Sequence, residues 1–474
     1  MQHNTKYNQV LRFIEQNSSN NKCLLDRFSI DSRQIKKDQV FISLASNISK
    51  NIKNIKHAIS RGAYAFITTC PISRRDIITC NPYLVIKEMN QVIIDLYITE
   101  LKDLSKRTTL IGITGTNGKT STSLVLAQAL TLQNKRVGII SSEGIGVYPH
   151  LKHSAYTTPP IDTNYKSLKN FLTKKCDYII IECSSQGLHQ GRLDVLIFNY
   201  SLITNIHQDH IEYHKSQKNY INSKLKILNQ SLTKILNYDS LNLKNIDAKK
   251  FNCRRLFYIS QKKIKNKKVL NTTFKPPSKN TSSFNIYTLM MVAAIMKFEK
   301  FNEVQINKSI SNLSPVLGRR HFITTKDKGV FIIDYAHTVE AYRELFKEIC
   351  TNKETTTLFG CGGDRDKSKR RITGGIVDQY STNIIITEDN SRSEKFSSIY
   401  RDIREGIKDT KKITIIKSRK KAIKHMFNMS SSNKLNFILG KGNENFIYEN
   451  NKIIKHNDII CLKKIIENHE HKTI

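Results

Sequence analysis

The chain has 474 residues, 39% of them hydrophobic, and its 77 Lys and Arg against 40 Asp and Glu give a formal net charge of +37. This length exceeds what one hydrophobic core supports, which favours about three domains, and the apolar runs that recur from end to end exclude a mostly disordered chain. The excess Lys is scattered among Asn and Ile without interleaved aromatic residues, so we predict no specific nucleic-acid partner.

Cysteine usage and the apolar segments bear on the compartment. The nine Cys residues form no C-x-x-C pair and no disulfide-like framework, which is typical of reduced thiols. The N-terminus lacks a continuous apolar stretch with a small-residue cleavage site, and the apolar run 286–296 is too short to span a bilayer. We therefore expect a cytoplasmic monomer with no membrane partner.

The first part of the chain, residues 1–105, mixes short β-like runs at 40–44 and 63–67 with helical pieces, which predicts a small N-terminal α/β domain. A buried-strand pattern from Leu110 then opens a central domain, residues 106–314. A Gly-rich turn, a helical run at 122–132 and further strands at 137–140 and 178–181 give the βαβ alternation of a parallel sheet.

The segment 240–283 interrupts this pattern. It is polar and Lys-rich and contains Pro276 and Pro277, which indicates an irregular excursion and not core.

The strongest local signal is G-I-T-G-T-N-G-K-T-S at 112–121, between the apolar strand and the helical run. Glycines let backbone N–H groups close around phosphates at a helix N-terminus, while Lys119 can reach the β- and γ-phosphates and Thr120 can bind Mg²⁺. The first Gly is one place off the standard P-loop spacing, but Gly115 and Gly118 keep the cradle. The sequence therefore predicts a nucleotide phosphate site.

Two further groups of residues point to a metal beside that site. Glu182 ends the strand 178–181, where a carboxylate is a natural Mg²⁺ ligand, although a satisfied strand-end Glu is the alternative. The segment 204–214 is dense in His and acidic residues, but its spacing matches neither H-E-x-x-H nor a Cys/His zinc site. We favour one or two of its groups facing a nucleotide-bound metal.

After Pro315 a third alternation of strands and helices predicts a doubly wound, Rossmann-like C-terminal domain, residues 315–474. Each of four predicted strands is followed by a polar cluster at the carboxyl edge, where open α/β sheets bind ligands. Arg and acidic groups together suit a zwitterion, because Arg clamps a carboxylate and the acids accept from an ammonium. The strands are 330–333, 357–359, 384–387 and 437–439, and the clusters are 334–338, 360–366, 389–392 and 440–444.

These blocks, in this order, resemble the Mur ligase family, and most of all its branch that adds the third residue of the peptidoglycan stem peptide. The match covers nearly the whole chain and includes T-G-T-N-G-K-T, T-T-P, E-x-S-S, Q-G-R, T-N-x-x-x-D-H, D-Y-A-H-T, G-C-G-G-D-R-D and G-K-G-x-E. The resemblance implies a ligase that uses ATP and Mg²⁺. The D-glutamate γ-carboxylate of a UDP-N-acetylmuramoyl-dipeptide would take the γ-phosphoryl group, and the amine of meso-diaminopimelate would attack the acyl phosphate.

The resemblance also implies a role for each domain and for named residues. The N-terminal domain would bind the UDP substrate, the central domain ATP and the C-terminal domain the amino acid. Catalytic roles fall on Lys119, Glu182, His210 and Lys224. Metal ligands would be Thr120, Glu182, His210 and, if it is carbamylated, Lys224. ATP binding falls on Gly115, Thr116, Asn117, Gly118, Lys119, Thr120, Ser121, Asp334 and His337. The UDP substrate would contact Ser32, Asn47, Thr157, Thr158, Ser184, Gln190 and Arg192. Diaminopimelate would contact Arg365, Asp389, Asn390, Ser391, Arg392, Gly440 and Glu444.

One motif bears on the choice of amino acid. Family members that use meso-diaminopimelate typically carry D-N-P-R, whose Arg holds the distal carboxylate that lysine lacks, whereas 389–392 reads D-N-S-R. Arg392 favours diaminopimelate, and Ser391 is expected to loosen the loop because Pro would have fixed its backbone. A lysine-adding ligase of the same family and a decayed, inactive ligase remain as alternatives.

Overall fold

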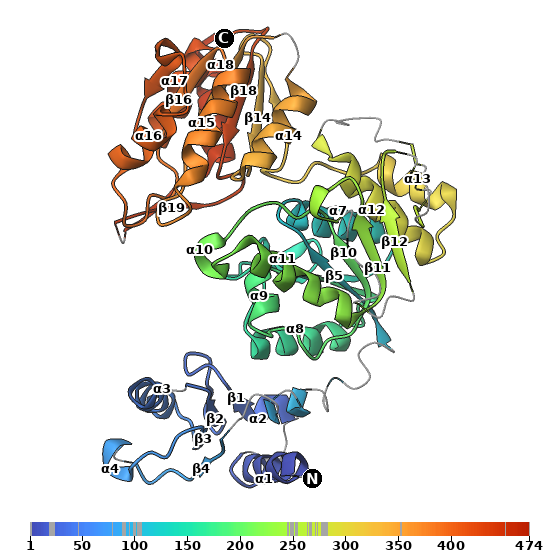
Figure 1. The fold of residues 1–474 in the computed structure, drawn as a ribbon, viewed down its shortest axis with the longest axis vertical. Coiled ribbons are helices and arrows are strands. Elements are labelled where there is room, and N and C mark those ends of the chain that lie inside the picture. Colours follow the sequence, from blue (N-terminus) through green and yellow to red (C-terminus); the bar gives the residue numbers. More distant parts are fainter. Residues whose placement is uncertain are drawn as a thin grey trace. The chain divides into compact units, whose positions relative to one another are not determined.

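The computed structural model describes residues 2–18, 24–45, 47–77, 79–87, 92–93, 95–97, 101, 107–243, 246, 251, 255–262, 264, 268–270, 272, 274–275, 283–350, 353–450 and 452–473 (Figure 1). The predicted boundary between residues 105 and 106, the pair Pro276 and Pro277 and much of the excursion at 240–283 lie outside these residues. The described part of 240–283 corrects the prediction that this segment is irregular and not core: Leu256–Ile259 forms strand β12 of the eight-stranded sheet, and Leu243, Tyr258 and Ile259 are buried. The chain forms two compact units. One comprises Met1–Gly112, Lys135–Ser201 and Lys226–Thr233, and the other comprises Ile113–Asn134, Leu202–Leu225 and Lys234–Ile474.

A four-stranded sheet forms near the N-terminus, with its strands parallel in the order β1-β2-β3-β4. Phe41 of β2 pairs with Phe66 of β3, and both pack with Ile55 and Ala58 of α3, which explains why these apolar positions are buried. The predicted strands at 40–44 and 63–67 correspond to β2 and β3. The elements are α1 (Gln2–Gln16), α2 (Leu24–Arg27), β1 (Phe28–Ser29), β2 (Val40–Ser43), α3 (Ile48–Ser60), β3 (Ala65–Thr68), α4 (Arg74–Ile77) and β4 (Tyr83–Val85).

An eight-stranded sheet follows, in the order β12-β11-β10-β5-β9-β6-β7-β8. The β6/β9 and β11/β12 pairs are parallel, whereas β6, β7 and β8 form an antiparallel meander. Its strands are β5 (Thr109–Thr114), β6 (Val137–Ser141), β7 (Gly144–Val147), β8 (His150–Lys152), β9 (Tyr178–Glu182), β10 (Phe198–Ile203), β11 (Ser231–Asn237) and β12 (Leu256–Ile259). Its helices are α7 (Lys119–Thr131), α8 (Ile161–Thr173), α9 (Ser185–His189), α10 (Ile211–His214), α11 (Gln217–Leu225), α12 (Ile286–Phe298), α13 (Glu303–Ser311) and the 3₁₀ turns η1 (Lys226–Gln230) and η2 (Leu241–Leu243).

Close packing of helices around this sheet has visible causes in the sequence. A Cβ added at Gly138 of β6 would stand 2.7 Å from the ring of Phe171, so the absence of a side chain lets α8 lie close to the strand. The apolar run 286–296 forms α12, which is buried all round and packs against α7, as expected for a core helix. Helix α7 begins at Lys119, earlier than the predicted 122–132, because Gly118 ends the loop in a left-handed conformation.

The C-terminal sheet has the order β13-β14-β18-β15-β16-β17 and is parallel except for the edge strand β13. Its strands are β13 (His321–Thr324), β14 (Val330–Asp334), β15 (Thr355–Phe359), β16 (Asn383–Ile386), β17 (Ile413–Ile415) and β18 (Leu435–Leu439), with a hairpin of β19 (Phe446–Glu449) and β20 (Lys452–Lys455). Its helices are α14 (Val339–Ile349), α15 (Ser368–Tyr380), α16 (Phe396–Arg404), η5 (Thr410–Lys412), α17 (Arg419–Met429) and α18 (Asp458–Thr473).

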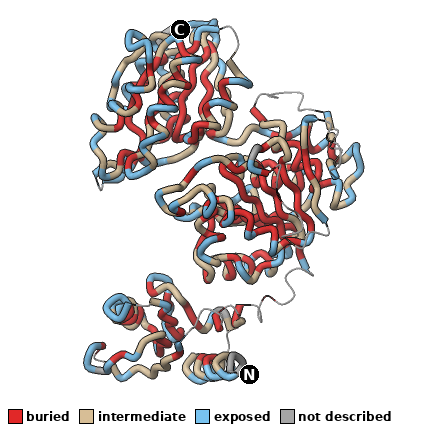
Figure 2. The backbone as a smooth tube through the Cα atoms, viewed as in Figure 1, coloured by how far each residue is buried: buried red, intermediate tan, exposed pale blue. Residues whose placement is uncertain are grey.

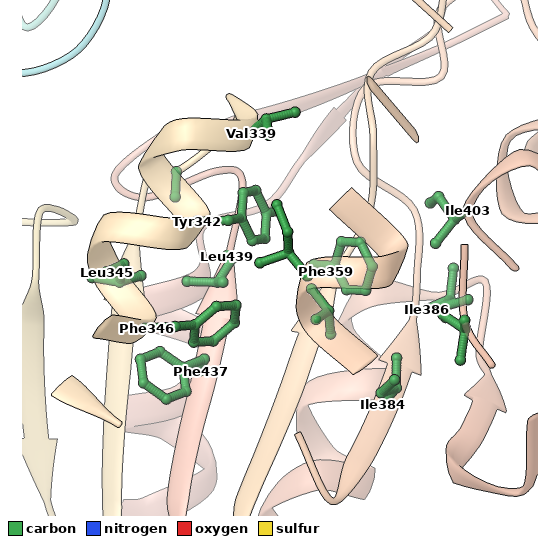
Figure 3. Close-up of a cluster of buried hydrophobic side chains, with 14 of the residues drawn as sticks. Val339, Tyr342, Leu345, Phe346, Phe359, Ile384, Ile386, Ile403, Phe437 and Leu439 are labelled. Carbon is green, nitrogen blue, oxygen red and sulfur yellow. The ribbon is translucent and has the colours of Figure 1, made fainter. Parts of the chain in front are cut away.

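Alternate residues of the central strands enter two separate cores on the two faces of this sheet. Phe437 and Leu439 of β18 pack with side chains of α14, α15 and α16 (Figure 3), whereas Ile438 between them packs with α17 and α18. Burial concentrates along these strands (Figure 2). The sheet is therefore doubly wound, and the predicted α/β class with parallel-rich sheets is confirmed.

Within the part of the chain that the structure describes, no helix combines the length and the apolar character needed to cross a membrane.

Candidate active site

The loop between β5 and α7 is held in a tight turn by residues that follow β10. Gly115 has a φ of +151°, and a Cβ there would stand 1.8 Å from Oγ1 of Thr204, so no side chain fits. The N–H of Thr116 donates to the carbonyl of Asn205 (2.9 Å), and the N–H of Asn117 donates to its Oδ1 (2.9 Å). The T-N pair of the 204–214 segment thus supports the predicted phosphate loop directly.

The N-terminus of α7 has the features that an anion site requires. Gly118 occupies the N-cap with a φ of +83°, and no side chain caps the helix. The Nζ of Lys119 donates to the carbonyls of Gly115 (2.9 Å) and Thr116 (3.0 Å), so its ammonium lies over the loop. Next to it, Thr120 is buried.

Helix α11 brings a second lysine to the same loop. Lys224 is 1% exposed, and its Nζ donates to the carbonyl of Gly115 at 2.6 Å. Its ammonium lies 4.9 Å from the centre of the Tyr220 ring, whose hydroxyl shares a 2.8 Å hydrogen bond with Oγ1 of Thr116. Lys119 and Lys224 were both predicted as catalytic, although they lie about a hundred residues apart in the sequence. In the structure both side chains donate to the same carbonyl, that of Gly115.

His210 precedes α10 with a left-handed φ of +52° and lies between two carboxylates. Its Nε2 is 3.4 Å from Asp209, and its Nδ1 is 3.4 Å from Glu212. Among the described residues this Nδ1 has no hydrogen-bond partner although it is buried, and burial lowers the pKa of the imidazole. A neutral imidazole nitrogen can ligate a metal, but Mg²⁺ prefers oxygen ligands, and among the described residues no three His, Cys, Asp or Glu side chains lie together as a metal site. The role of His210 as a metal ligand therefore stays a prediction.

Asp334 and His337, the other predicted ATP residues, lie at the end of β14. The Oδ2 of Asp334 accepts from the N–H of Arg320 (2.7 Å), and Nδ1 of His337 is 2.9 Å from the carbonyl of Tyr335. Thr338, the next residue, accepts a 2.9 Å hydrogen bond from Nδ2 of Asn117. That bond links this segment to the phosphate loop.

Glu182, the last residue of β9, is fully buried and belongs to the other compact unit, together with most residues predicted for the UDP substrate. Oγ1 of Thr158 donates to the carbonyl of Glu182 (2.6 Å) and accepts from the N–H of Ser184 (2.9 Å), which caps α9. Arg192 donates to the carbonyl of Thr158 and to Oε1 of Gln190 (2.9 Å). Thr158, Ser184, Gln190 and Arg192 thus form one cluster beside Glu182.

A pocket of about 550 Å³ lies in the same unit, and Ser32, Lys53 and His57 are among its lining residues. The Nδ1 of His57 is 3.0 Å from Oγ of Ser32. Arg33 and Lys53 bring positive charge to this lining, and Asp31 and Asp162 bring carboxyl groups, so its charge is mixed. Asn47, by contrast, caps α3 by accepting from the N–H of Lys50 (3.1 Å). Thr157 directly precedes Thr158 and is half-buried.

The four polar clusters of the C-terminal domain follow β14, β15, β16 and β18, which are neighbours in the sheet and parallel, so their predicted common edge is confirmed. At this edge lies a fully buried lysine, Lys441. Its Nζ donates to Oε2 of Glu444 (2.7 Å) and Oδ1 of Asn390 (3.1 Å) and is 3.8 Å from Asp389. Tyr335 donates to the other oxygen of Glu444 (3.1 Å).

Two predicted arginines lie at the same edge. Arg392 has a φ of +53°, and its guanidinium donates to the carbonyl of Gly363 (2.6 Å). Arg365 pairs with Glu212 of α10 at 3.0 Å. The backbone N–H of Gly440 donates to the carbonyl of Asp334 (3.1 Å), which ties the ends of β18 and β14 together.

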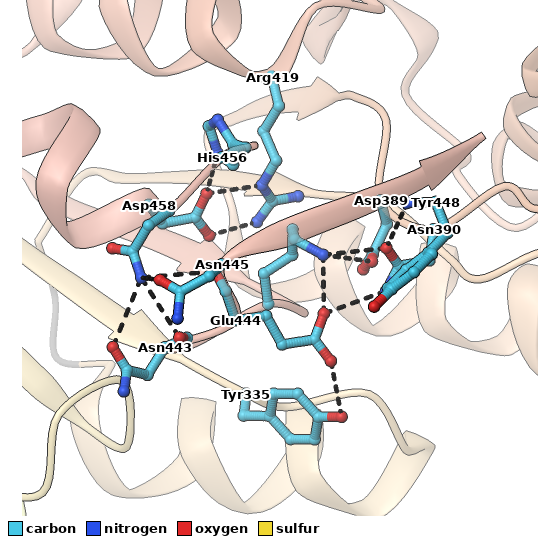
Figure 4. Close-up of polar contacts among 12 residues, drawn as sticks. Tyr335, Asp389, Asn390, Arg419, Asn443, Glu444, Asn445, Tyr448, His456 and Asp458 are labelled. Carbon is cyan, nitrogen blue, oxygen red and sulfur yellow. Dashed lines mark hydrogen bonds and ion pairs between the residues drawn. The ribbon is translucent and has the colours of Figure 1, made fainter. Parts of the chain in front are cut away.

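Arg419 and Asp458 support this edge and were not predicted from the sequence. Both side chains are 0% exposed, and they form a bidentate ion pair at 2.7 and 2.8 Å (Figure 4). The guanidinium also donates to the carbonyls of Leu439 (2.9 Å) and Glu388 (3.2 Å), just before Gly440 and Asp389. The two residues are 39 positions apart and carry no local motif, whereas Lys441 stood visibly inside G-K-G-N-E.

Known proteins resemble this chain over nearly its full length. The Mur ligase middle domain matches residues 113–308, and the Mur ligase glutamate ligase domain matches residues 318–442. UDP-N-acetylmuramoyl-L-alanyl-D-glutamate–2,6-diaminopimelate ligase of Wigglesworthia glossinidia brevipalpis is 33% identical over 473 residues, 94% of this chain and 95% of that protein. The protein of the same name from Buchnera aphidicola subsp. Baizongia pistaciae is 30% identical over 92% of each chain.

A solved structure of a ligase with this name shares the fold, with a TM-score of 0.61 at 23% identity over 97% of this chain and 99% of that chain. Sequence identity of 33% across almost the whole length, together with the phosphate loop and the polar sheet edge, supports one family assignment. The chain belongs to the Mur ligase family.

Proposed function

We propose that this protein is an ATP-dependent amide ligase of peptidoglycan synthesis that joins meso-2,6-diaminopimelate to the D-glutamate γ-carboxylate of UDP-N-acetylmuramoyl-L-alanyl-D-glutamate. The observation that carries the proposal is the similarity over 94% of the chain to a curated ligase named for this substrate pair. The uncapped N-terminus of α7 and the buried polar sheet edge of the C-terminal domain support it.

In this proposal the phosphate loop holds ATP. The N–H groups at the start of α7 and the ammonium of Lys119 bind the phosphates, and Asp334 and His337 assist from the end of β14. Thr120, Glu182, His210 and, if carbamylated, Lys224 would hold Mg²⁺. When bound, Mg²⁺ neutralises charge that develops on the phosphate oxygens.

The reaction then runs in two steps. The D-glutamate γ-carboxylate attacks the γ-phosphorus of ATP, which gives an acyl phosphate and ADP. The neutral substrate amine attacks the acyl carbon and loses a proton to solvent as the amide bond forms, and phosphate leaves with the electron pair of the broken C–O bond. The ammonium groups of Lys119 and, when it is not carbamylated, Lys224 both donate to the carbonyl of Gly115 in the phosphate loop, where they would stabilise negative charge on the transferring group.

The substrates divide between the two compact units. Thr157, Thr158, Ser184, Gln190 and Arg192, with Ser32 in its pocket and Asn47, would contact the UDP substrate. Arg365, Asp389, Asn390, Ser391, Arg392, Gly440 and Glu444 would contact diaminopimelate. The guanidinium of Arg392 suits the distal carboxylate, and the carboxylates of Asp389 and Glu444 suit an ammonium.

The three-domain division at residues 1–105, 106–314 and 315–474, the cytoplasmic location, the monomeric state and the absence of a specific nucleic-acid partner stay predictions. Lysine as the amino acid and a decayed active site are the competing functional hypotheses.

Release of ADP from Mg-ATP and the UDP-muramoyl-dipeptide tests the proposal, with meso-diaminopimelate, L-lysine or no amino acid added. We expect release only with diaminopimelate. Release with lysine would overturn the choice of amino acid, and no release with either would favour a decayed enzyme.

A further inference from the structure

The 389–392 segment, which carries the predicted amino-acid specificity, is held on one side by the β19/β20 hairpin. Arg392 adopts the left-handed region, which is uncommon and unfavourable for a residue with a side chain. Its N–H donates to the carbonyl of Tyr448 (2.8 Å), and its carbonyl accepts from the N–H of Asn450 (2.6 Å). These two bonds hold the backbone at Arg392, the C-terminal end of the segment. They do not hold the backbone of the residues that precede Arg392 in the turn.

Glu388 supplies a second restraint. The backbone N–H of Ser391 donates to Oε1 of Glu388 at 2.9 Å, in a site where Ser391 is 1% and Glu388 4% exposed. Burial raises the pKa of Glu388, and the hydrogen bond from Ser391 opposes that shift. A buried N–H that loses its acceptor is costly, so this contact constrains the turn between the two residues.

The contact depends on which residue stands at position 391. Proline has no N–H and would restrict the turn through its ring, whereas serine leaves the backbone free and offers a donor. Here the donor is used by a side chain only three residues earlier in the chain. The hydrogen bond from Ser391 to Glu388 thus restrains the turn in this chain, as the ring of a proline at position 391 would do.

The backbone of Glu388 is anchored independently of its side chain. Its N–H donates to the carbonyl of Lys417 (3.1 Å), and its carbonyl accepts from Arg419 (3.2 Å). The carboxylate therefore projects from a fixed point to the N–H of Ser391. At the other end of the segment, the guanidinium of Arg392 donates to the carbonyl of Gly363 (2.6 Å). The N–H of Gly363 in turn donates to the backbone carbonyl of Asn390 (2.8 Å).

We propose that Glu388 is a positioning residue for amino-acid specificity: by accepting the N–H of Ser391, its carboxylate fixes the turn that presents the Arg392 guanidinium to the distal carboxylate of a diamino dicarboxylate. The identity of that substrate rests on the proposed function. The restraint on the segment does not.

The test compares Glu388→Ala, which removes the acceptor, with Glu388→Gln, which keeps an acceptor oxygen. Glu405→Ala removes an exposed carboxylate of the same domain and serves as the control. Steady-state constants are measured for diaminopimelate, lysine, ATP and the UDP substrate. Deuterium uptake of residues 389–394 is measured on the same full-length proteins.

For Glu388→Ala we expect the KM for diaminopimelate to rise about tenfold, from the loss of one hydrogen bond to a charged group, with kcat and the KM for ATP unchanged. Its preference for diaminopimelate over lysine should shrink, and residues 389–394 should exchange faster. Glu388→Gln should stay close to wild type. Equal KM values in Glu388→Ala and Glu405→Ala, a parallel loss in all constants, or an equal defect in Glu388→Gln would overturn the proposal.

Ser391→Pro removes the donor from the other side. If both residues act through one bond, the double variant Glu388→Ala/Ser391→Pro should be no worse than the poorer single variant, and multiplied defects would contradict this. If wild type releases no ADP with any amino acid, the proposed function fails. Hydrogen exchange then decides alone: faster exchange in Glu388→Ala than in Glu388→Gln supports the positioning role, and equal exchange overturns it.

Discussion

Replacing Arg419 by Met should cost much more stability than the same replacement of an exposed arginine of the C-terminal domain. The change keeps most of the side-chain volume but leaves Asp458 buried without its ion-pair partner, which typically costs about 3–5 kcal/mol. Two carbonyls, of Leu439 and Glu388, lose their donor as well. Against a usual total of about 5–15 kcal/mol, the expected loss is a large fraction of the free energy of unfolding.

Because the chain contains no Trp, unfolding is best followed by circular dichroism at 222 nm in urea, with hydrogen exchange in α17 and α18 to assign the transition to the C-terminal domain. Arg404→Met, an exposed position on α16, is the matched control and should change stability by less than about 0.5 kcal/mol. The double variant Arg419→Met/Asp458→Leu should recover part of the loss, since no buried charge is then left alone.

The pH dependence of this pair has a defined sign. Burial alone would raise the pKa of Asp458, but Arg419 and His456 hold it well below its usual range. The stabilisation is therefore present above the ordinary aspartate pKa and is lost as the pH falls towards the lowered value. If Arg419→Met unfolds at the same urea concentration as Arg404→Met, the reasoning from the buried pair is wrong.

Three other substitutions test separate parts of the structure. Gly115→Ala should abolish nucleotide binding, measured by calorimetry, because its Cβ would collide with Thr204. Arg392→Ala should raise the KM for diaminopimelate by about ten- to a hundredfold, from the loss of hydrogen bonds to a carboxylate, with no rise for lysine. Partial burial and the charge of Glu348 raise the pKa of Glu344 to about 7, so its stabilising contribution is present below pH 4.5 and lost as the pH rises through 7. Glu344→Gln should therefore gain melting temperature relative to wild type at pH 8 and not at pH 4, by an amount that solvent reduces because the side chain is 45% exposed.

The parts of the fold that the sequence predicted are those whose pattern is local. The strands at 330–333 and 437–439 are apolar runs buried on both faces, and they appear as β14 and β18. Strand β17 (Ile413–Ile415) and edge strand β13 were not predicted, because short, half-exposed strands lack such a run.

The candidate site divides in the same way. The phosphate loop and the clusters after the C-terminal strands were visible because each is a contiguous group of polar residues. The ion pair of Arg419 and Asp458 was not, since its partners meet only through the packing of α17 and α18. Asn47 shows that a motif residue need not bind a ligand. It caps helix α3, which is by itself a structural reason for an asparagine at this position.

The bond between Ser391 and Glu388 also shapes how this segment can evolve. A first change at either position leaves a buried donor or a buried carboxylate behind, so neither residue can drift alone without a loss of fitness. The residue at each of the two positions therefore affects which substitutions the other position tolerates. A change to proline at position 391 would be tolerated most easily after Glu388 had already been replaced by a smaller, uncharged residue.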